Sequence, residues 1–310
     1  MSQPEQEKTA DTSAAAVPEL TVPVAAGQYA NVDPSRPGKL LDAADRKSPD
    51  SGLSNVARIY DYLLGGNDNY AADREAARQL VEAVPDAPRA ARDNRAFLSR
   101  AVRLLTAERG ICQIIDIGTG LPTRGAVHEI AQASNPATRV VYVDNDPVVV
   151  AHSRMLISDS QQVAAVHGDV RYPGHLMTLR GVRNLIDFDL PTAVLLVAVL
   201  HFVPDDENPW AAVATIMDHL TPGSFLVVSH VTSDQIPDEA VRRAREIYNS
   251  ALVRGEARSR SEIQRLFEGL EMVPPGLVDV AEWRSGQRAP AIGRPVLFWA
   301  GIGQKPRSGQ

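Results

Sequence analysis

Residues 113–123, QIIDIGTGLPT, pass from an apolar run into one aspartate and then into a turn with two glycines and a proline. A short apolar run bounded by turn residues is typical of a buried strand. The strand would end near Asp116, and the turn Gly118-Thr119-Gly120 would follow, where missing side chains let the backbone approach a ligand. Pro122 suits the first turn of a helix. A tight connection explains such a turn equally well, so its meaning depends on the rest of the chain.

Short apolar runs followed by amphipathic stretches recur from Gly110 onward. Strands that are apolar on both faces and alternate with helices indicate a parallel sheet covered on both sides. We therefore predict a doubly wound α/β domain over 109–303, followed by a flexible C-terminus at 304–310. The apolar runs are RVVYVD (139–144), QVAAVHGD (162–169), PTAVLLVAVL (191–200) and GSFLVVSHV (223–231). Helices are expected from about 123, from Pro147, at 237–253 and near 261–268, and strand-like segments at about 270–283 and 294–300.

The first 50 residues differ from the rest of the chain. Residues 1–50 hold six prolines and a single aromatic residue, Tyr29. Such a segment buries too little apolar surface to offset the entropy of ordering. We predict that it is a mostly disordered tail.

Residues 51–108 are predicted to form a helical extension. Apolar residues recur at helical spacing from Val56, and Gly65-Gly66 would end this first helix. Two further helices are expected, at 71–84 and 88–107. On the last one, five arginines lie opposite the apolar residues, and we interpret them as a solvated face, with a patch for an acidic substrate or partner as the alternative. They are Arg89, Arg92, Arg95, Arg100 and Arg103.

Composition limits the classes of function. The 310 residues carry a net charge of −6 and a sequence pI near 5.7, so we expect no nucleic acid as a partner. The single cysteine, Cys112, excludes a disulfide framework and a cysteine metal cluster and fits a reducing, cytoplasmic setting. No segment resembles a signal peptide or has the length of a membrane span. Histidines and carboxylates show no metal-ligand spacing, so we predict no metal site.

Carboxylates follow three of the predicted strands: Asp116, Asp144 in VYVDNDP and Asp169 in HGDV. Ligands of open α/β sheets bind at the carboxyl ends of the strands, so these side chains are expected to share one crevice. A nicotinamide dinucleotide needs a diphosphate seat, but GTGLPT has Thr123 where GxGxxG has its third glycine. S-adenosylmethionine has no phosphate, and its sulfonium and amino groups favour nearby carboxylates. The turn therefore favours S-adenosylmethionine as the cofactor.

Four stretches, IIDIGTG, VDNDP, HGDV and AVLHFVPD, resemble in order the cofactor motifs of class I S-adenosylmethionine-dependent methyltransferases. With RIYDYLLGGNDNYAADREAA (58–77), ARDNRAFLSRAVRLL (91–105) and the GTGLPT variant, the chain from about 50 to 302 resembles a bacterial family of predicted methyltransferases, catalogued as a domain of unknown function. The resemblance implies a Rossmann-like, doubly wound sheet of seven strands, with the helical extension as a cap on the acceptor side. The missing third glycine departs from the broader superfamily at the seat of the cofactor's amino-acid end.

The resemblance also implies roles for individual residues. Asp116, Gly118 and Gly120 would line the methionine end of the cofactor. Asp144, with Asn145 as a further cofactor-binding residue, would bind the ribose, and Asp169 with Val170 would bind the adenine. Leu200, within VLHF (199–202), would close the site beneath the sulfonium.

The acceptor is expected beside the extension, where polar and aromatic residues crowd around the Gly-Gly turn. The predicted substrate-binding residues are Tyr60, Asn67, Asn69, Tyr70 and, at the end of the fifth strand, His230. Core packing is the alternative for the tyrosine at 60, and turn formation for the asparagine at 67.

Methyl transfer depends mostly on aligning the acceptor with the methyl group in a dry pocket, and a catalytic base is optional. If the acceptor must lose a proton, His201, at the end of the fourth strand, is the candidate base. Tyr60 is the second predicted catalytic residue. A packing or hydrogen-bonding role is the alternative for His201 and His230.

Three classes of function remain. We favour a methyltransferase that acts on a small molecule. A regulatory protein that binds S-adenosylmethionine without turnover is the alternative, and a nicotinamide-dependent oxidoreductase is disfavoured by the GTGLPT turn. The sequence assigns no acceptor and no oligomeric state.

Overall fold

The computed structural model describes residues 53–122, 125–158, 160–286 and 294–307. The chain divides into two units, one ending at Ala43 and one from Ala44 onward. The predicted tail, 1–50, lies outside the described residues.

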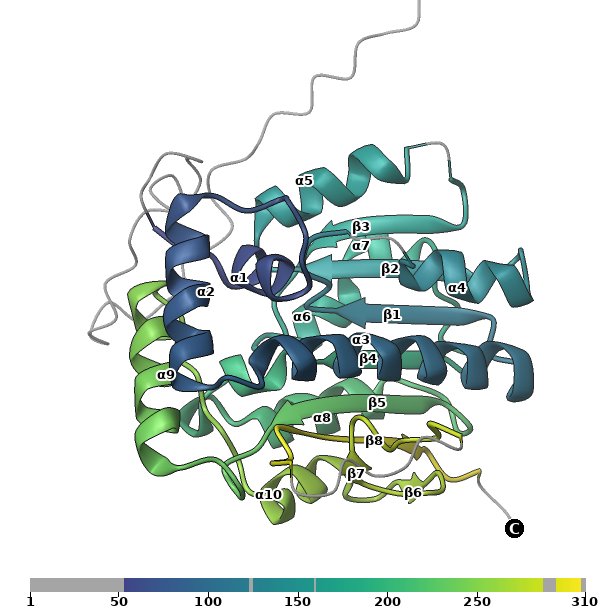
Figure 1. The fold of residues 1–310 in the computed structure, drawn as a ribbon. Coiled ribbons are helices and arrows are strands. Elements are labelled where there is room, and N and C mark those ends of the chain that lie inside the picture. Colours follow the sequence, from purple (N-terminus) through teal and green to yellow (C-terminus); the bar gives the residue numbers. More distant parts are fainter. Residues whose placement is uncertain (1–52, 123–124, 159, 287–293, 308–310) are drawn as a thin grey trace, which may run out of the picture. The chain divides into compact units, whose positions relative to one another are not determined.

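Eight strands of the described residues form one sheet (Figure 1). They are β1 (Gln113–Ile117), β2 (Arg139–Asp144), β3 (Val163–His167), β4 (Ala193–Val197), β5 (Phe225–Val231), β6 (Glu271–Met272), β7 (Val278–Asp279) and β8 (Phe298–Gln304). The strand order is β3-β2-β1-β4-β5-β8-β6, and β7 also pairs with β8. The strands β1 to β5 are parallel, whereas β8 is antiparallel to β5.

This sheet confirms the predicted Rossmann-like, doubly wound fold, with a difference at one edge. Seven strands were expected, and the eighth arises because β6 and β7, of two residues each, pair with different parts of β8. The strand β8 also runs beyond the expected end at 300. Lys305 follows it and donates its Nζ to the carbonyl oxygens of Met217 and Leu220, each at 2.8 Å. The ordered chain therefore extends past 303, where a flexible terminus was predicted.

The helices of the described residues are α1 (Val56–Leu63), α2 (Ala71–Ala83), α3 (Ala87–Arg103), α4 (Val127–Ser134), α5 (Pro147–Leu156), α6 (Pro173–Thr178), α7 (Arg180–Arg183), α8 (Pro209–Asp218), α9 (Asp238–Ser250) and α10 (Arg260–Gln264). Three further turns are 3₁₀-helical, Leu200–Phe202, Asp205–Glu207 and Arg265–Phe267, and Leu104–Glu108 is a π-helical turn that continues α3. None of the helices in the described ranges is long and apolar enough to cross a membrane.

Successive side chains of the strands point to opposite faces of the sheet, and each face has its own buried core. Ile114 of β1 belongs to the core under α3 and α4. Its neighbour Ile115 belongs to the core on the other face, with side chains of α6 and α8. Both isoleucines are fully buried. Because β1 is apolar on both faces, it lies in the middle of the sheet with helices on either side.

A third core joins the helical extension to α9. Ile59 and Leu63 of α1, with Leu80 of α2, pack with Ile247 of α9. Figure 1 shows these three helices beside the ends of the strands that carry the arrowheads. The helices of the extension therefore cover the carboxyl edge of the sheet together with a helix from much later in the chain.

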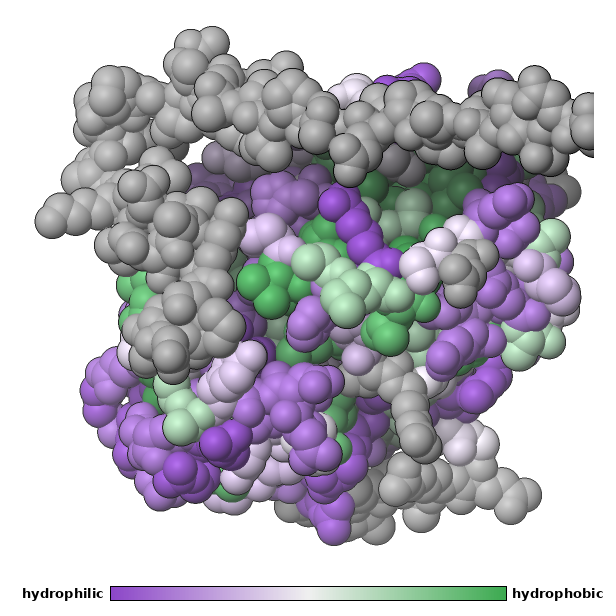
Figure 2. Space-filling model, turned by 90° about the horizontal axis from the view of Figure 1, so that it is seen from above, coloured by the Kyte–Doolittle hydropathy of each residue, from purple (hydrophilic) through white to green (hydrophobic). Residues whose placement is uncertain are grey.

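On the side of the molecule where α5 lies, hydrophilic residues surround a group of hydrophobic ones (Figure 2). The α5 helix contributes two exposed apolar side chains to the surface, Met155 and Leu156.

Of the five arginines of α3, only Arg92 and Arg103 are exposed, so the helix forms only part of the solvated face that the sequence indicated. Arg100 donates to the carbonyl oxygens of Val280 and Trp283, at 2.8 and 2.7 Å. Arg89 forms ion pairs within its own helix region, and Arg95 donates to the carbonyl oxygen of Gly125 at 3.1 Å. Long arginine side chains reach partners on neighbouring segments, and a helical projection of the sequence cannot show these contacts.

Candidate functional site

A cavity of 420 Å³ lies at the carboxyl ends of β1 to β4. The strand order reverses between β1 and β4, and this is the place where open α/β sheets bind their ligands. The remaining walls come from α1, α3 and α9 and from residues 252–257.

The glycine turn after β1 brings the backbone close to this cavity. Gly118 and Gly120 both line it and have φ angles of +72° and +63°, which glycine adopts without the steric cost of a Cβ. A Cβ at Gly118 would lie 2.3 Å from Cγ2 of Val199. Gly118 N donates to the carbonyl oxygen of Val143 at 2.8 Å. The turn is therefore fixed against β2, and Gly118 is required both by its backbone angle and by its neighbour.

Asp116, at the end of β1, lines the cavity and is only 7% exposed. Its carboxylate accepts no hydrogen bond from any residue in the described part of the chain. Burial raises the pKa of Asp116 to about 7, the positive charge of Arg95 lowers it, and the negative charge of Asp144 raises it. A cationic group in the cavity would add its charge to that of Arg95 and would meet a carboxylate to which no described residue donates a hydrogen bond.

Asp144, at the end of β2, is held by two backbone amides. Its Oδ2 accepts from Gly120 N at 3.0 Å and its Oδ1 from Asp146 N at 2.9 Å. Burial raises the pKa of Asp144 to about 6, although these two hydrogen bonds act to lower it. The side chain is thereby fixed at the edge of the glycine turn, with carboxylate lone pairs left for a ligand's hydroxyl groups.

Asp169, after β3, forms an ion pair with Arg171 at 2.5 Å. Burial alone would raise the pKa of Asp169, but its hydrogen bonds to Arg171 and the charge of that arginine lower it below its usual value. Asn145 Nδ2 also donates to Asp169, at 3.4 Å. Asp169, Asn145 and the buried Val170 line the cavity together.

The structure places nine of the predicted site residues in the lining of one cavity and leaves five out. The nine are Tyr60, Asp116, Gly118, Gly120, Asp144, Asn145, Asp169, Val170 and His201. The five outside the lining are Asn67, Asn69, Tyr70, Leu200 and His230. Leu200 is fully buried in the core under α6 and α8.

Residues of the polar loop after α1 donate hydrogen bonds to the carboxylate of Asp61, and their own side chains do not line the cavity. Asp61 is 4% exposed, and its Oδ2 accepts from Asp68 N at 2.9 Å and from Asn69 Nδ2 at 2.8 Å. A Cβ at Gly66 would lie 2.0 Å from Asp61 Oδ1, so the second glycine leaves room for the carboxylate. Asn69 therefore supports Asp61, which does line the cavity.

The other two predicted substrate-binding residues of that loop, Asn67 and Tyr70, do not line the cavity either. Asn67 is exposed in the turn. Tyr70 is 48% exposed, its backbone N–H donates to Asp73 at 2.8 Å, and the guanidinium of Arg58 lies 5.2 Å from its ring centre. The density of polar residues in NDNY therefore reflects the start of α2 and the support of Asp61.

The hydroxyl of Tyr60 forms two hydrogen bonds within the protein, one as donor and one as acceptor. It donates to the carbonyl oxygen of Ala91 at 3.1 Å and accepts from Asn94 Nδ2 at 2.9 Å. Asn94 Oδ1 in turn accepts from the hydroxyl of Ser229 at 2.6 Å. Burial raises the pKa of Tyr60. This geometry favours a role for Tyr60 in shaping the wall rather than in proton transfer.

His201 lies in the 3₁₀ turn after β4 and is 7% exposed. No described residue forms a hydrogen bond with either of its ring nitrogens, and Nδ1 is fully buried. Burial, His230 and the charge of Arg258 hold the pKa of His201 well below its usual value. The ring is therefore neutral at physiological pH and has one nitrogen able to accept a proton or a hydrogen bond.

His230 lies behind His201, with their ring centres 5.5 Å apart. Its Nδ1 is 2.7 Å from the carbonyl oxygen of Val231, and because a carbonyl only accepts, Nδ1 carries the proton. Its Nε2 then accepts from the Arg258 guanidinium at 2.8 Å. Burial lowers the pKa of His230 to about 3. The predicted substrate-binding histidine thus belongs to the wall behind the site.

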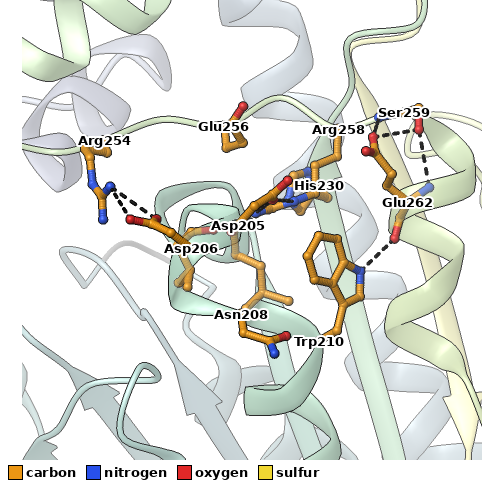
Figure 3. Close-up of polar contacts among 12 residues, drawn as sticks. Asp205, Asp206, Asn208, Trp210, His230, Arg254, Glu256, Arg258, Ser259 and Glu262 are labelled. Atoms are coloured by element: carbon orange, nitrogen blue, oxygen red, sulfur yellow. Dashed lines mark hydrogen bonds and ion pairs between the residues drawn. The ribbon is translucent and has the colours of Figure 1, made fainter.

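Arg258 is the residue of this wall that sequence reasoning missed. It is 1% exposed and donates to the carbonyl oxygens of Leu200, at 3.0 Å, and Val203, at 2.7 Å, on either side of the 3₁₀ turn. It also pairs with Asp205 at 2.7 Å, and Figure 3 shows it beside His230. One buried cation therefore fixes the turn that carries His201. The stretch ARSRSE (257–262) holds two arginines and gives no signal that Arg258 has this role.

The residues present fit S-adenosylmethionine. Asp116 is a buried carboxylate without a partner in the described chain, as a cationic cofactor requires, and the turn at Gly118 has no room for a side chain. Within the described ranges, no group of three His, Cys, Asp or Glu side chains is placed to hold a metal ion.

Comparison with known proteins places the chain in a family. Residues 42–306 match the model of the S-adenosyl methyltransferase family. A protein of Thermobifida fusca YX proposed to be a methyltransferase is 39% identical, with a TM-score of 0.79 over 83% of this chain and 97% of that one. A DUF574 family protein of Streptomyces avermitilis MA-4680 is 36% identical, with a TM-score of 0.78 over 84% of this chain and 100% of that one.

No curated protein matches the chain. The extent of the family match, together with the fold and the carboxylates at the strand ends, establishes that the chain belongs to the S-adenosyl methyltransferase family, whose cofactor is S-adenosylmethionine.

Proposed function

We propose that this protein transfers the methyl group of S-adenosylmethionine to a small-molecule acceptor inside the cavity at the strand ends. The observation that carries the proposal is Asp116, a buried carboxylate without a partner in the described chain, which faces a cavity enclosed on its other side by α1, α3 and α9. The bound cofactor would supply an activated methyl group on a cationic sulfur.

Asp116 would hold the cationic end of the cofactor, beside the backbone of Gly118 and Gly120. Asp144 and Asn145 would bind the ribose hydroxyls, and Asp169 with Val170 the adenine. These roles are supported by the common lining of the cavity and by the fixed orientation of the Asp144 carboxylate.

His201 would accept the proton of the acceptor, since it is neutral, lines the cavity and has no other partner in the described chain. Tyr60 would shape the acceptor side of the wall.

A small-molecule acceptor is supported by the size of the cavity, which lies in the range of pockets for single small ligands. The acidic net charge supports an acceptor other than nucleic acid. The single cysteine supports a cytoplasmic location.

Calorimetric titration of the full chain with S-adenosylmethionine, S-adenosylhomocysteine and NAD tests the proposal. We expect micromolar binding of both adenosyl ligands and none of NAD. Asp144→Ala should weaken adenosyl binding at least about tenfold, because it removes charge-assisted hydrogen bonds to the ribose.

Asp189→Ala is the matched control, because Asp189 is an exposed aspartate that does not line the cavity. This variant should keep the wild-type affinity. Binding of NAD alone, or equal affinities of the wild type and Asp144→Ala, would contradict the proposal.

A further inference from the structure

The part of the cavity opposite the strand ends is mainly apolar. Its side chains come from the helical extension and from the two segments that close over it, 236–241 and 297–298. They include Leu63, Leu80, Val84, Leu98, Ile236 and Leu297. A ligand that fills this half must therefore present an apolar body.

Three charged groups at this end of the cavity already have partners. Arg245 pairs with Glu256 at 2.7 Å, and Arg254 pairs with Asp206 at 3.0 Å. The carboxylate of Asp61 accepts hydrogen bonds from its own loop. An ionic acceptor would have to break one of these contacts or remain unpaired in an apolar space, and both are costly.

Four aromatic rings gather beside the turn that carries His201. The ring centre of Phe202 is 4.2 Å from that of His201 and 5.3 Å from that of Tyr248. The ring centre of Phe298 lies 5.9 Å from that of His201. All four residues line the cavity. Aromatic pairs with offset or edge-to-face geometry are favourable beyond the area they bury, so this wall suits a flat aromatic ring.

Two polar groups in this wall have no hydrogen-bond partner in the described chain: the ring nitrogens of His201 and the hydroxyl of Tyr248. The Tyr60 hydroxyl and the Asn94 side chain nearby are both hydrogen-bonded. Buried polar groups are usually paired, so the unpaired ones mark where a ligand's polar atoms belong.

We propose that the methyl acceptor is a neutral aromatic compound with a hydroxyl group, whose ring packs among Phe202, Tyr248 and Phe298 and whose hydroxyl donates to His201. This proposal rests on the function proposed above. The hydroxyl oxygen forms the new bond to the methyl carbon, and the sulfur of the cofactor keeps the electron pair of the broken C–S bond. The hydroxyl proton passes to His201 and then to solvent.

An aromatic amine that is protonated fits this wall less well. Arg258 holds the turn of His201 from behind, so a second positive charge beside His201 would be repelled. A carboxylate fits less well because the neighbouring arginines at the rim, Arg245 and Arg254, already have acidic partners.

Four probes that share one ring system test this inference: 1-naphthol, naphthalene, 1-naphthoate and 1-naphthylmethylammonium. Each is titrated into the full chain saturated with S-adenosylhomocysteine, and ring fluorescence reports binding. We expect 1-naphthol to bind tightest, by about threefold to tenfold over naphthalene, the value of one neutral hydrogen bond. His201→Phe should abolish this preference and leave naphthalene binding nearly unchanged. With S-adenosylmethionine, 1-methoxynaphthalene should form, which mass spectrometry detects.

His152→Phe, at an exposed histidine of α5, is the matched control and should keep the preference for 1-naphthol. Tighter binding of either charged probe, no binding of any probe, or an unchanged preference in His201→Phe would overturn the inference. The titration with S-adenosylhomocysteine comes first, so a failure there refutes the proposed function, whereas a failure of the probes on loaded protein refutes only the class of acceptor.

Discussion

A buried carboxylate without a partner in the described chain destabilises a fold whenever it is charged, and Asp116 is such a group. In an unfolded chain the pKa of an aspartate is near 3.9, well below the pKa of about 7 for Asp116 in the folded protein. Between these two pH values the folded state holds the extra proton, so stability falls as the pH rises. The loss is on the order of 4 kcal/mol for a shift of this size.

Asp116→Asn should therefore be more stable than the wild type by about 4 kcal/mol at pH 8 but by only about 1 kcal/mol at pH 4.5, because the amide mimics the protonated acid. Urea denaturation at pH 4.5, 6 and 8 measures this difference. The same variant should lose affinity for S-adenosylhomocysteine. Parallel stability profiles of the two proteins would show that Asp116 does not titrate in this range.

Gly118→Ala should destabilise the protein and abolish cofactor binding. The new Cβ would meet Val199 at 2.3 Å in a residue with φ of +72°. Gly110→Ala is the matched control, because Gly110 has φ of +70° and a Cβ added there would meet nothing within 4 Å. The excess cost of Gly118→Ala should be about 1–3 kcal/mol, the usual range for overpacking, by chemical denaturation. Equal costs would show that Val199 moves away freely.

Single residues differ in how far the sequence predicts them. Asp116 and Asp144 could be found because they follow apolar strands, and parallel strands bring their carboxyl ends together. Arg258 could not, because its partners at Leu200 and Val203 are set by tertiary packing. The sequence correctly places His230 at the end of β5, but Arg258 donates to its ring, and the side chain lies behind the cavity lining.

Among the secondary-structure elements, α1 has the most direct influence on the cavity. Its N-cap residue Asn55 accepts from Ala57 N at 2.9 Å and donates its Nδ2 to Asp146 at 2.8 Å, at the start of α5. One side chain therefore both caps α1 and ties it to the loop after β2.

Asn55→Ala should cost about 1–2 kcal/mol, the usual value of a lost N-cap, and should speed amide exchange in α1. It should also weaken binding of S-adenosylhomocysteine, because α1 lines the cavity. Asn208→Ala removes the cap of α8, where Asn208 accepts from Ala211 N at 3.1 Å, and serves as the control. It should speed exchange in α8 without changing affinity. Faster exchange in α1 with full affinity would contradict the role of α1 as a wall.

The elements themselves were predicted well where a periodic pattern is long. The first helices and the central strands follow from such patterns, and α2 (Ala71–Ala83) ends one residue before the predicted end. The pattern shows that a helix is amphipathic but not what it packs against, so the contact of Ile247 in α9 with the helical extension was missed. The edge strands β6 and β7 are too short for a period to be visible.

In the whole second unit, the helical extension and the sheet share their cores. Phe97 of α3 packs edge-to-face with Trp283 at 5.3 Å, in the same core as Phe298 and Ala300 of β8. Because α3 belongs to a core of the sheet and the core of α1 and α2 includes Ile247 of α9, we do not expect the extension to unfold alone.

Scanning calorimetry should accordingly show a single unfolding transition for the described part of the chain. S-adenosylhomocysteine at about 100 times its dissociation constant should stabilise the protein by about 2.7 kcal/mol, which raises Tm by roughly 5–10 °C. Two transitions, with only the later one shifted by the ligand, would show that the extension folds independently of the site.

A crystal structure of the complex with S-adenosylhomocysteine would show whether the cavity at the strand ends binds the cofactor beside an apolar acceptor space. We expect the amino-acid end to lie at Asp116 and Gly118, the ribose to be bound by Asp144, and the sulfur to point toward His201. A ligand bound outside this cavity, or one with its sulfur directed away from His201, would contradict this expectation.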